Sequence, residues 1–164
     1  MEVPVYLFTG FLEGGKTTVI QQTLSDPNFN SGERFLLIVC EEGAEEYDPT
    51  AFAKPNVYIE YIEDSSTLTA SCLTALLDKH KCNRVIVEYN GMWLLNDFYQ
   101  ALPENWMVYQ EMMFADAGSF ETFNTNMRQL TVDKLQSCEA VILNRATDIT
   151  DKDSIHKIVR AVNR

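Results

Sequence analysis

The strongest indication of fold and function is the stretch Gly10-Phe11-Leu12-Glu13-Gly14-Gly15-Lys16-Thr17, which matches the phosphate-binding loop pattern G-x-x-x-x-G-K-[ST]. The apolar run over residues 3–8 before it predicts a buried strand, and residues 17–24 after it predict a helix. In such a loop, glycines let backbone N–H groups close around phosphate oxygens, and the helix start adds partial positive charge. The stretch therefore predicts a chain that binds a nucleoside triphosphate, or that descends from one that did.

Two side chains of this loop carry the chemistry. Lys16 is long enough to reach the outer phosphates, and the Thr17 hydroxyl can ligate Mg²⁺.

Length and composition describe one ordinary globular domain. The 164 residues, 46% hydrophobic and 23% charged, suit a single domain spanning 1–164. The net charge of −11 opposes an electrostatic attachment to nucleic acid or to an anionic membrane, and no apolar run approaches the length of a membrane span. We therefore expect no nucleic-acid or membrane partner, and phosphates held by local geometry.

The four cysteines, Cys40, Cys72, Cys82 and Cys138, lie far apart and form no C-x-x-C pair. In a chain with no signal peptide, such cysteines are expected to be reduced and mostly buried thiols. The sequence therefore predicts a cytoplasmic protein.

Strand and helix patterns alternate along the chain, which predicts an α/β fold. The expected class is the three-layer P-loop NTPase fold, with a mainly parallel sheet and helices on both faces. A helix near residues 68–77 is expected to take its cap from Asp64-Ser65-Ser66. The other expected elements are strands at 34–39, 57–62, 84–88, 108–115 and 140–143, and helices at 94–102, 119–138 (in one or two pieces) and 155–162.

Polar residues follow most of the expected strands. In open α/β sheets, ligands lie outside the carboxyl ends of the strands, so these residues are candidates for one shared site. They are Glu41, Glu42, Glu88, Asp116 and Asn144.

A carboxylate at a strand end is needed to hold Mg²⁺ opposite the phosphate loop, and several residues compete for that role. Glu88 is favoured over Asp116, because the nearby Gly91 would let the backbone pass close to a γ-phosphate. In the acidic loop after the second strand, Glu42 is the best candidate for a metal or switch role. The alternative for such an acidic run is a solvated, self-repelling segment.

Asn144 follows a buried strand, as the base-reading Asn of the N-K-x-D motif does in GTPases. In that motif a carboxylate accepts hydrogen bonds from guanine N1–H and the exocyclic amine, which adenine cannot match. Here Arg145 can stack its stem on a base as Lys would, and Asp148 stands one residue late. A one-residue bulge would still deliver this carboxylate, so guanine is the expected base.

These segments together resemble the CobW-like GTPases, relatives of the UreG and HypB metallochaperones, over nearly the whole chain. The resemblance rests on residues 9–18, on the Glu-rich loop after the second strand, and on Glu88-Tyr89-Asn90-Gly91, which is similar to the family's Glu-x-x-Gly. Residues 114–117 and 143–145 follow in the expected order.

The resemblance implies GTP binding with slow Mg²⁺-dependent hydrolysis, coupled to delivery of a transition metal such as zinc or cobalt to a metalloprotein client. It places Glu42 and Glu45 in switch I, makes residues 88–91 the γ-phosphate sensor, and makes a homodimer across the nucleotide face plausible. The phosphate and Mg²⁺ contacts it implies come from Gly10, Phe11, Leu12, Glu13, Gly14, Gly15, Lys16, Thr17 and Thr18.

The sequence departs from the family pattern in two ways, and these limit what the resemblance implies for this chain. The family's Cys-x-Cys-Cys metal motif is missing, and Cys72 is the only cysteine near its place. One thiol cannot build the thiolate-rich site that favours Zn²⁺. The C-terminal domain that family members usually carry is also expected to be absent.

The leading hypothesis is a GTPase switch in which Lys16 neutralises developing charge and Glu88 positions metal-bound water or senses its loss. No arginine finger is obvious, so isolated turnover should be slow. One alternative, motivated by the late Asp148, is an ATP-dependent kinase or ligase. The other, motivated by Glu13 within the loop and the lost cysteine motif, is a degenerate nucleotide-binding module that docks a partner.

Overall fold

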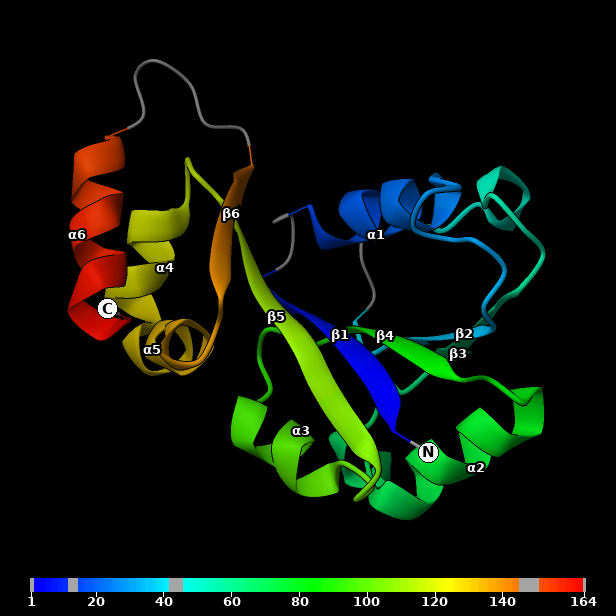
Figure 1. The fold of residues 1–164 in the computed structure, drawn as a ribbon. Helices are drawn as coiled ribbons and strands as arrows, with labels where there is room; N and C mark the ends of the chain where they lie inside the picture. The colour runs from blue at the N-terminus through cyan, green and yellow to red at the C-terminus, as the bar shows by residue number, and fades with distance from the viewer. Residues whose placement is uncertain (1, 12–14, 42–45, 145–150, 164) are drawn as a thin grey trace.

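The computed structural model describes residues 2–11, 15–41, 46–144 and 151–163 and shows one sheet of six strands (Figure 1). All strand pairs are parallel, in the order β3-β2-β4-β1-β5-β6. The strands are β1 (Val3–Gly10), β2 (Phe35–Val39), β3 (Val57–Tyr61), β4 (Arg84–Glu88), β5 (Trp106–Asp116) and β6 (Ala140–Asn144).

Helices connect the strands and cover both faces of the sheet. They are α1 (Lys16–Ser25), α2 (Ala70–His80), α3 (Leu95–Ala101), α4 (Phe120–Asn126), α5 (Arg128–Gln136) and α6 (Lys152–Val162), with short 3₁₀ turns η1 (Pro49–Ala51) and η2 (Ser65–Thr67). The predicted α/β class is confirmed, and the sheet is parallel throughout rather than mainly.

Alternation along the strands divides the core into two layers. In β1, Val5 and Leu7 face one apolar cluster with α2 and α3, whereas Phe8 faces another with α1. The central strands are therefore buried on both faces, as their nearly continuous apolar sequences predict.

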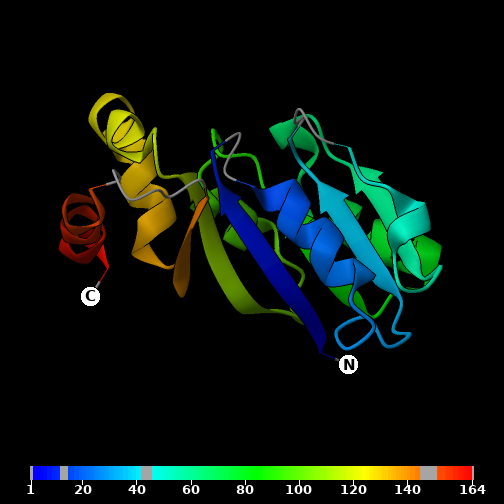
Figure 2. The same ribbon diagram turned by 90° about the horizontal axis from the view of Figure 1, so that it is seen from above.

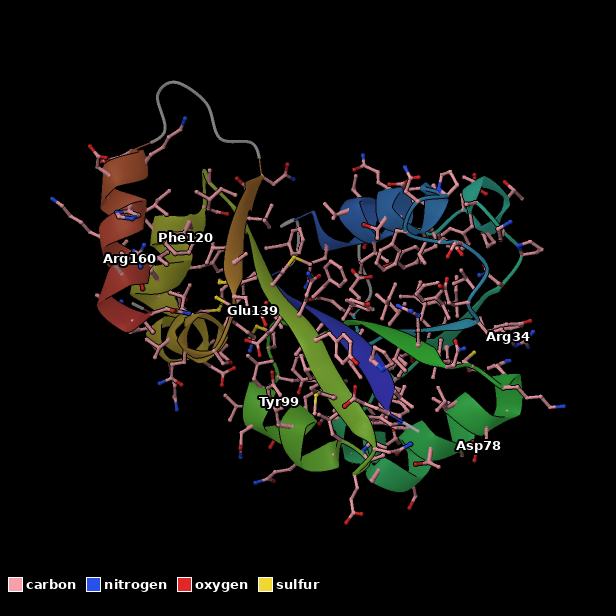
Figure 3. The ribbon with its side chains drawn as sticks, in the orientation of Figure 1. Arg34, Asp78, Tyr99, Phe120, Glu139 and Arg160 are labelled. Carbon is pink, nitrogen blue, oxygen red and sulfur yellow. The ribbon has the colours of Figure 1, made fainter. Side chains whose placement is uncertain are left out.

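A third apolar cluster joins α4, α5 and α6 to β5 and β6. Phe120 of α4 is buried in this cluster (Figure 3). Seen from above, these helices gather at the β6 edge, away from α1 (Figure 2). This cluster includes Phe11, which follows β1, so it reaches the segment where the phosphate loop begins.

The predicted cap of the second helix was wrong. Thr69 caps α2 by accepting a hydrogen bond from the Cys72 N–H, and the helix begins at Ala70. Asp64 instead caps the separate 3₁₀ turn η2, where it accepts from Ser66 N–H. Two possible caps stood within five residues of each other, and the chain uses both.

Among the described residues, every helix is too short or too polar to traverse a lipid bilayer.

We expect Leu36→Ala and Leu37→Ala each to lower the free energy of unfolding by about 2–5 kcal/mol, because each removes a fully buried side chain. The two residues face different clusters, so both layers are tested. Urea denaturation would measure the loss, with the exposed Met107→Ala as a control expected to change stability by less than about 1 kcal/mol. A small effect from only one leucine would mean that one face of β2 is not part of the core.

Candidate functional site

The carboxyl ends of β1, β2 and β4 meet at the start of α1. Glu88 at the end of β4 lies beside Phe8 of β1 and Val39 of β2 in the strand register. Hydrogen bonds continue past the strands, from Cys40 N–H to the Glu88 carbonyl and from Tyr89 N–H to the Phe8 carbonyl, both at 2.9 Å. The residues that follow these strands are thereby brought together, as the sequence predicted.

Glycines allow three main-chain segments to approach closely at this edge. A Cβ on Gly10, whose φ is +122°, would lie 1.9 Å from the Phe114 carbonyl oxygen. A Cβ on Gly91 would lie 2.4 Å from the Gly10 carbonyl oxygen, so this loop rests directly against the start of the phosphate loop. Gly15 also has a positive φ, of +92°. These close approaches bring main-chain groups and the Lys16 ammonium to the start of the loop, and such groups fit a phosphate group.

Lys16 is the central cation of the site and is only 3% exposed. Its Nζ donates to the Gly10 carbonyl at 2.6 Å and to the Tyr89 carbonyl at 3.2 Å, and forms an ion pair with the Glu41 carboxylate. An ammonium this buried needs such acceptors. Phosphate oxygens would therefore have to take the place of some of these groups.

Glu88 receives hydrogen bonds from two sides. Thr17 Oγ1 donates to Glu88 Oε1 at 2.6 Å, and the Tyr47 hydroxyl donates to Glu88 Oε2. Burial and the adjacent Glu88 carboxylate raise the pKa of Tyr47, so its hydroxyl stays protonated. The Thr17 hydroxyl and the Glu88 carboxylate are hard oxygen donors of the kind that Mg²⁺ prefers.

Asp116, the competing carboxylate, occupies a different position. It ends β5 and its Oδ1 accepts from Gly118 N–H at 2.8 Å, within the turn that leads to α4. In the strand register it lies opposite Asn144 of β6, two strands from Glu88. The geometry thus pairs Glu88, rather than Asp116, with Thr17.

Asn144 lies beside the phosphate loop. A Cβ on Gly15 would come within 3.0 Å of the Asn144 side-chain nitrogen. The Asn144 carbonyl accepts from Ala117 N–H at 2.8 Å, which ties the ends of β5 and β6 together. The expected base-reading residue is therefore next to the expected phosphate-binding residues.

The other predicted positions are less informative. The Phe11 ring is buried and stacks on Phe123 at 4.4 Å between ring centroids, so only the main chain of Phe11 could face a phosphate. Thr18 is exposed on the first turn of α1. Seven further predicted residues lie outside the described part of the chain: Leu12, Glu13, Gly14, Glu42, Glu45, Arg145 and Asp148.

Two site residues were underestimated from the sequence. Glu41 was predicted only as one of the polar residues near strand ends, and Glu42 was preferred to it for a metal or switch role. Tyr47 was not predicted at all, because one aromatic residue beyond an acidic loop carries no distinguishing pattern.

Thiols do not form a metal centre in the described residues. No group of three or more His, Cys, Asp or Glu side chains that could hold a metal occurs in the described ranges. Burial, with Glu88 and Glu41 nearby, raises the pKa of Cys40 to about 12, which disfavours the thiolate that Zn²⁺ binds.

We expect Glu41→Gln to tighten nucleotide binding roughly tenfold, because phosphate would no longer compete with a carboxylate for Lys16. Without nucleotide the variant should melt at a lower temperature, since a nearly buried ammonium loses its counter-charge. Binding of labelled GDP without Mg²⁺ would measure the effect free of any metal contact. Weaker binding by the variant would contradict this expectation.

We expect one thiol in four to react quickly with a thiol reagent at pH 8. Cys72 is partly exposed, whereas Cys40, Cys82 and Cys138 are buried. Burial also raises the pKa of Cys82 to about 11, so little thiolate forms there. The fast phase should disappear in Cys72→Ser, and two or more fast thiols in the folded wild type would be inconsistent with this structure.

Comparisons with known proteins identify the family. Residues 4–164 match the family described as CobW/HypB/UreG, nucleotide-binding domain. Among solved structures, a zinc-bound triple mutant of the GTPase YjiA is similar, with a TM-score of 0.65 and 20% sequence identity over 97% of this chain and 54% of that one. This chain thus spans about half the length of that protein, and the likeness shows the fold. Curated proteins gave no match. The chain belongs to the CobW/HypB/UreG family, whose nucleotide-binding domain it matches from residue 4 to residue 164.

Proposed function

We propose that this chain is a GTP-binding domain that hydrolyses GTP slowly with Mg²⁺ and works as a nucleotide-driven switch. The observation that carries the proposal is the meeting of Lys16, Thr17 and Glu88 beside the close approach of Gly10 and Gly91. Membership of a family of nucleotide-binding domains supports it.

Each of these residues has a distinct role in the proposal. Lys16 binds the outer phosphates and offsets the charge that develops on them, with Gly10, Phe11, Leu12, Glu13, Gly14, Gly15 and Thr18 completing the phosphate loop. Thr17 and Glu88 would hold Mg²⁺, with Glu42 as a further candidate ligand. Bound Mg²⁺ supplies neutralisation of phosphate charge. Tyr47 orients the Glu88 carboxylate by hydrogen bonding.

Slow turnover is expected because the described arginines are engaged elsewhere. Arg34 donates to the carbonyls of His80 and Lys81, at the far end of the sheet, and Arg84 donates to the Tyr6 hydroxyl. Arg128 and Arg160 bond within the α4–α6 region. None of these four supplies positive charge to the phosphate loop, and GTPases without such an arginine hydrolyse slowly.

The choice of guanine in the proposal rests on the place of Asn144 beside Gly15. Arg145 and Asp148 would complete the base-reading end. An ATP-dependent kinase or ligase and a module that only docks a partner are the competing functions, and both are separated by the measurements below.

A link to transition-metal delivery is the outer part of the proposal. The similar structure of YjiA was solved with zinc bound. We propose that this chain likewise has a role linked to a transition metal, with a metalloprotein as its client. We also propose that it forms a homodimer. The described residues contain no cluster of thiolates that could bind the metal in that role. Cytoplasmic location fits the free, mostly buried thiols.

We expect Lys16→Ala to weaken binding of labelled GTP by about a hundredfold and to abolish Mg²⁺-dependent phosphate release, because the main cationic contact is lost. The control is Lys79→Ala, which removes an exposed lysine paired with Glu60 far from the phosphate loop. Thermal unfolding would establish that both variants are folded. Unchanged binding and hydrolysis in Lys16→Ala would refute the proposed function.

Parallel titrations with GTP and ATP, with and without Zn²⁺ or Co²⁺, separate the competing functions. Preference for GTP supports the switch, whereas clear preference for ATP supports the kinase or ligase. Binding without phosphate release supports the docking module. GTP binding strengthened by Zn²⁺ or Co²⁺ supports the metal-linked role, and indifference to them removes that part alone.

A further inference from the structure

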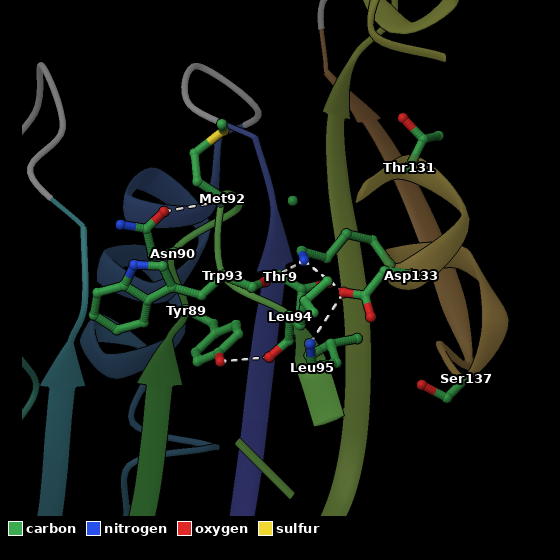
Figure 4. Close-up of polar contacts among 12 residues, drawn as sticks. Thr9, Tyr89, Asn90, Met92, Trp93, Leu94, Leu95, Thr131, Asp133 and Ser137 are labelled. Carbon is green, nitrogen blue, oxygen red and sulfur yellow. Dashed lines mark hydrogen bonds and ion pairs between the residues drawn. The ribbon is translucent and has the colours of Figure 1, made fainter. Parts of the chain in front are cut away.

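The segment of residues 89–95, which leaves β4 beside the phosphate loop, is fastened at two places. At its start, the Tyr89 carbonyl accepts from Lys16, and Gly91 rests against Gly10. At its end, the Trp93 carbonyl accepts from Lys134 Nζ at 2.5 Å, and Leu95 N–H donates to Asp133 Oδ2 at 3.0 Å. Figure 4 shows Asp133 of α5 pointing toward Leu95, with this contact drawn as a dashed line.

Lys134 is a charged group that the nucleotide site does not use, and its side chain is fully buried. Its ammonium also contacts Asp133 Oδ2 at 2.7 Å, so one carboxylate oxygen serves both Lys134 and the Leu95 N–H. Burial lowers the pKa of Lys134, and the Asp133 carboxylate opposes that effect. Apolar side chains usually fill such a position at lower cost in free energy. A buried ammonium and its part-buried carboxylate partner that bond two main-chain groups of one segment therefore indicate a positioning role.

The part of the segment between the two attachments is short, and the Asn90 side chain bonds both within it and to the residue that follows β2. The Asn90 side chain accepts from Met92 N–H at 2.8 Å and donates to the Cys40 carbonyl at 3.3 Å. Gly91 lies within this turn. The path of the main chain at Gly91 is therefore set by this turn and by the two attachments of the segment.

We propose that Asp133 and Lys134 are positioning residues that hold residues 89–95 so that Gly91 faces the γ-phosphate, and that they thereby set the preference for GTP over GDP. This inference rests on the proposed function, because it assumes a nucleotide in the phosphate loop. Loss of the Lys134 contact leaves Gly91 to be ordered during GTP binding, which weakens that binding. GDP has no γ-phosphate, so the affinity for GDP does not depend on the position of Gly91.

The test compares Lys134→Met, which keeps an unbranched side chain without the charge, with Thr131→Val as a matched control. Thr131 is also fully buried on α5, but its hydroxyl bonds to the carbonyls of Phe123 and Met127 rather than to residues 89–95. The dissociation constants of the full chain for GDP and for a non-hydrolysable GTP analogue, both with Mg²⁺, give the preference directly.

We expect Lys134→Met to weaken binding of the GTP analogue on the order of tenfold and to change GDP binding less than about twofold. Thr131→Val should leave the ratio of the two constants unchanged, even if the protein melts at a lower temperature. An equal effect of Lys134→Met on both nucleotides, or no effect on either, would overturn the proposal while leaving the proposed function intact.

A second measurement is independent of nucleotide. Hydrogen exchange at the Leu95 amide should speed up in Asp133→Ala, because that variant removes the acceptor of this N–H. The same variant should lower the preference for the GTP analogue, so it replaces Lys134→Met if the latter fails to fold. Unchanged exchange and unchanged preference in Asp133→Ala would overturn the proposal. A wild-type chain that binds neither nucleotide would refute the proposed function, and the positioning role with it.

Discussion

One nearly buried ammonium group holds the carboxyl edge of the sheet together. Lys16, on the first turn of α1, contacts the Gly10 carbonyl, the Glu41 carboxylate and the Tyr89 carbonyl. These groups lie at the end of β1 and just after β2 and β4, so a single charge draws together segments from three strands. A buried cation is tolerated only among such acceptors, and the arrangement of the surrounding loops follows from that requirement.

Close approach of main chains is the second requirement, and it explains how an acidic protein can offer a phosphate site. The net charge of −11 creates a field that repels phosphate. Gly10 and Gly91 remove the side chains that would separate their two segments, so backbone dipoles and Lys16 act at short range. Such local groups outweigh distant surface charges, because salt screens the latter beyond about 8–10 Å.

Local patterns were enough to predict the α/β fold and the placing of polar residues at the ends of its parallel strands, because both depend on residues close in sequence. The partners of the key charges were not predictable in this way. Glu41 lies 25 residues from Lys16, and Lys134 lies 41 residues from Trp93. Many acidic residues could have paired with Lys16, and only the fold selects among them. Even the local choice between Asp64 and Thr69 as the cap of α2 needed the structure.

The two lysines that hold residues 89–95 differ in what can replace their contacts. Lys16 bonds the Tyr89 carbonyl at the edge of the phosphate loop, and a phosphate oxygen is a stronger acceptor than a carbonyl. Lys134 is sealed from solvent, and its contact with the Trp93 carbonyl has no such competitor beside Asp133. Phosphate can therefore replace the Lys16 contact of this segment, whereas the Lys134 contact persists.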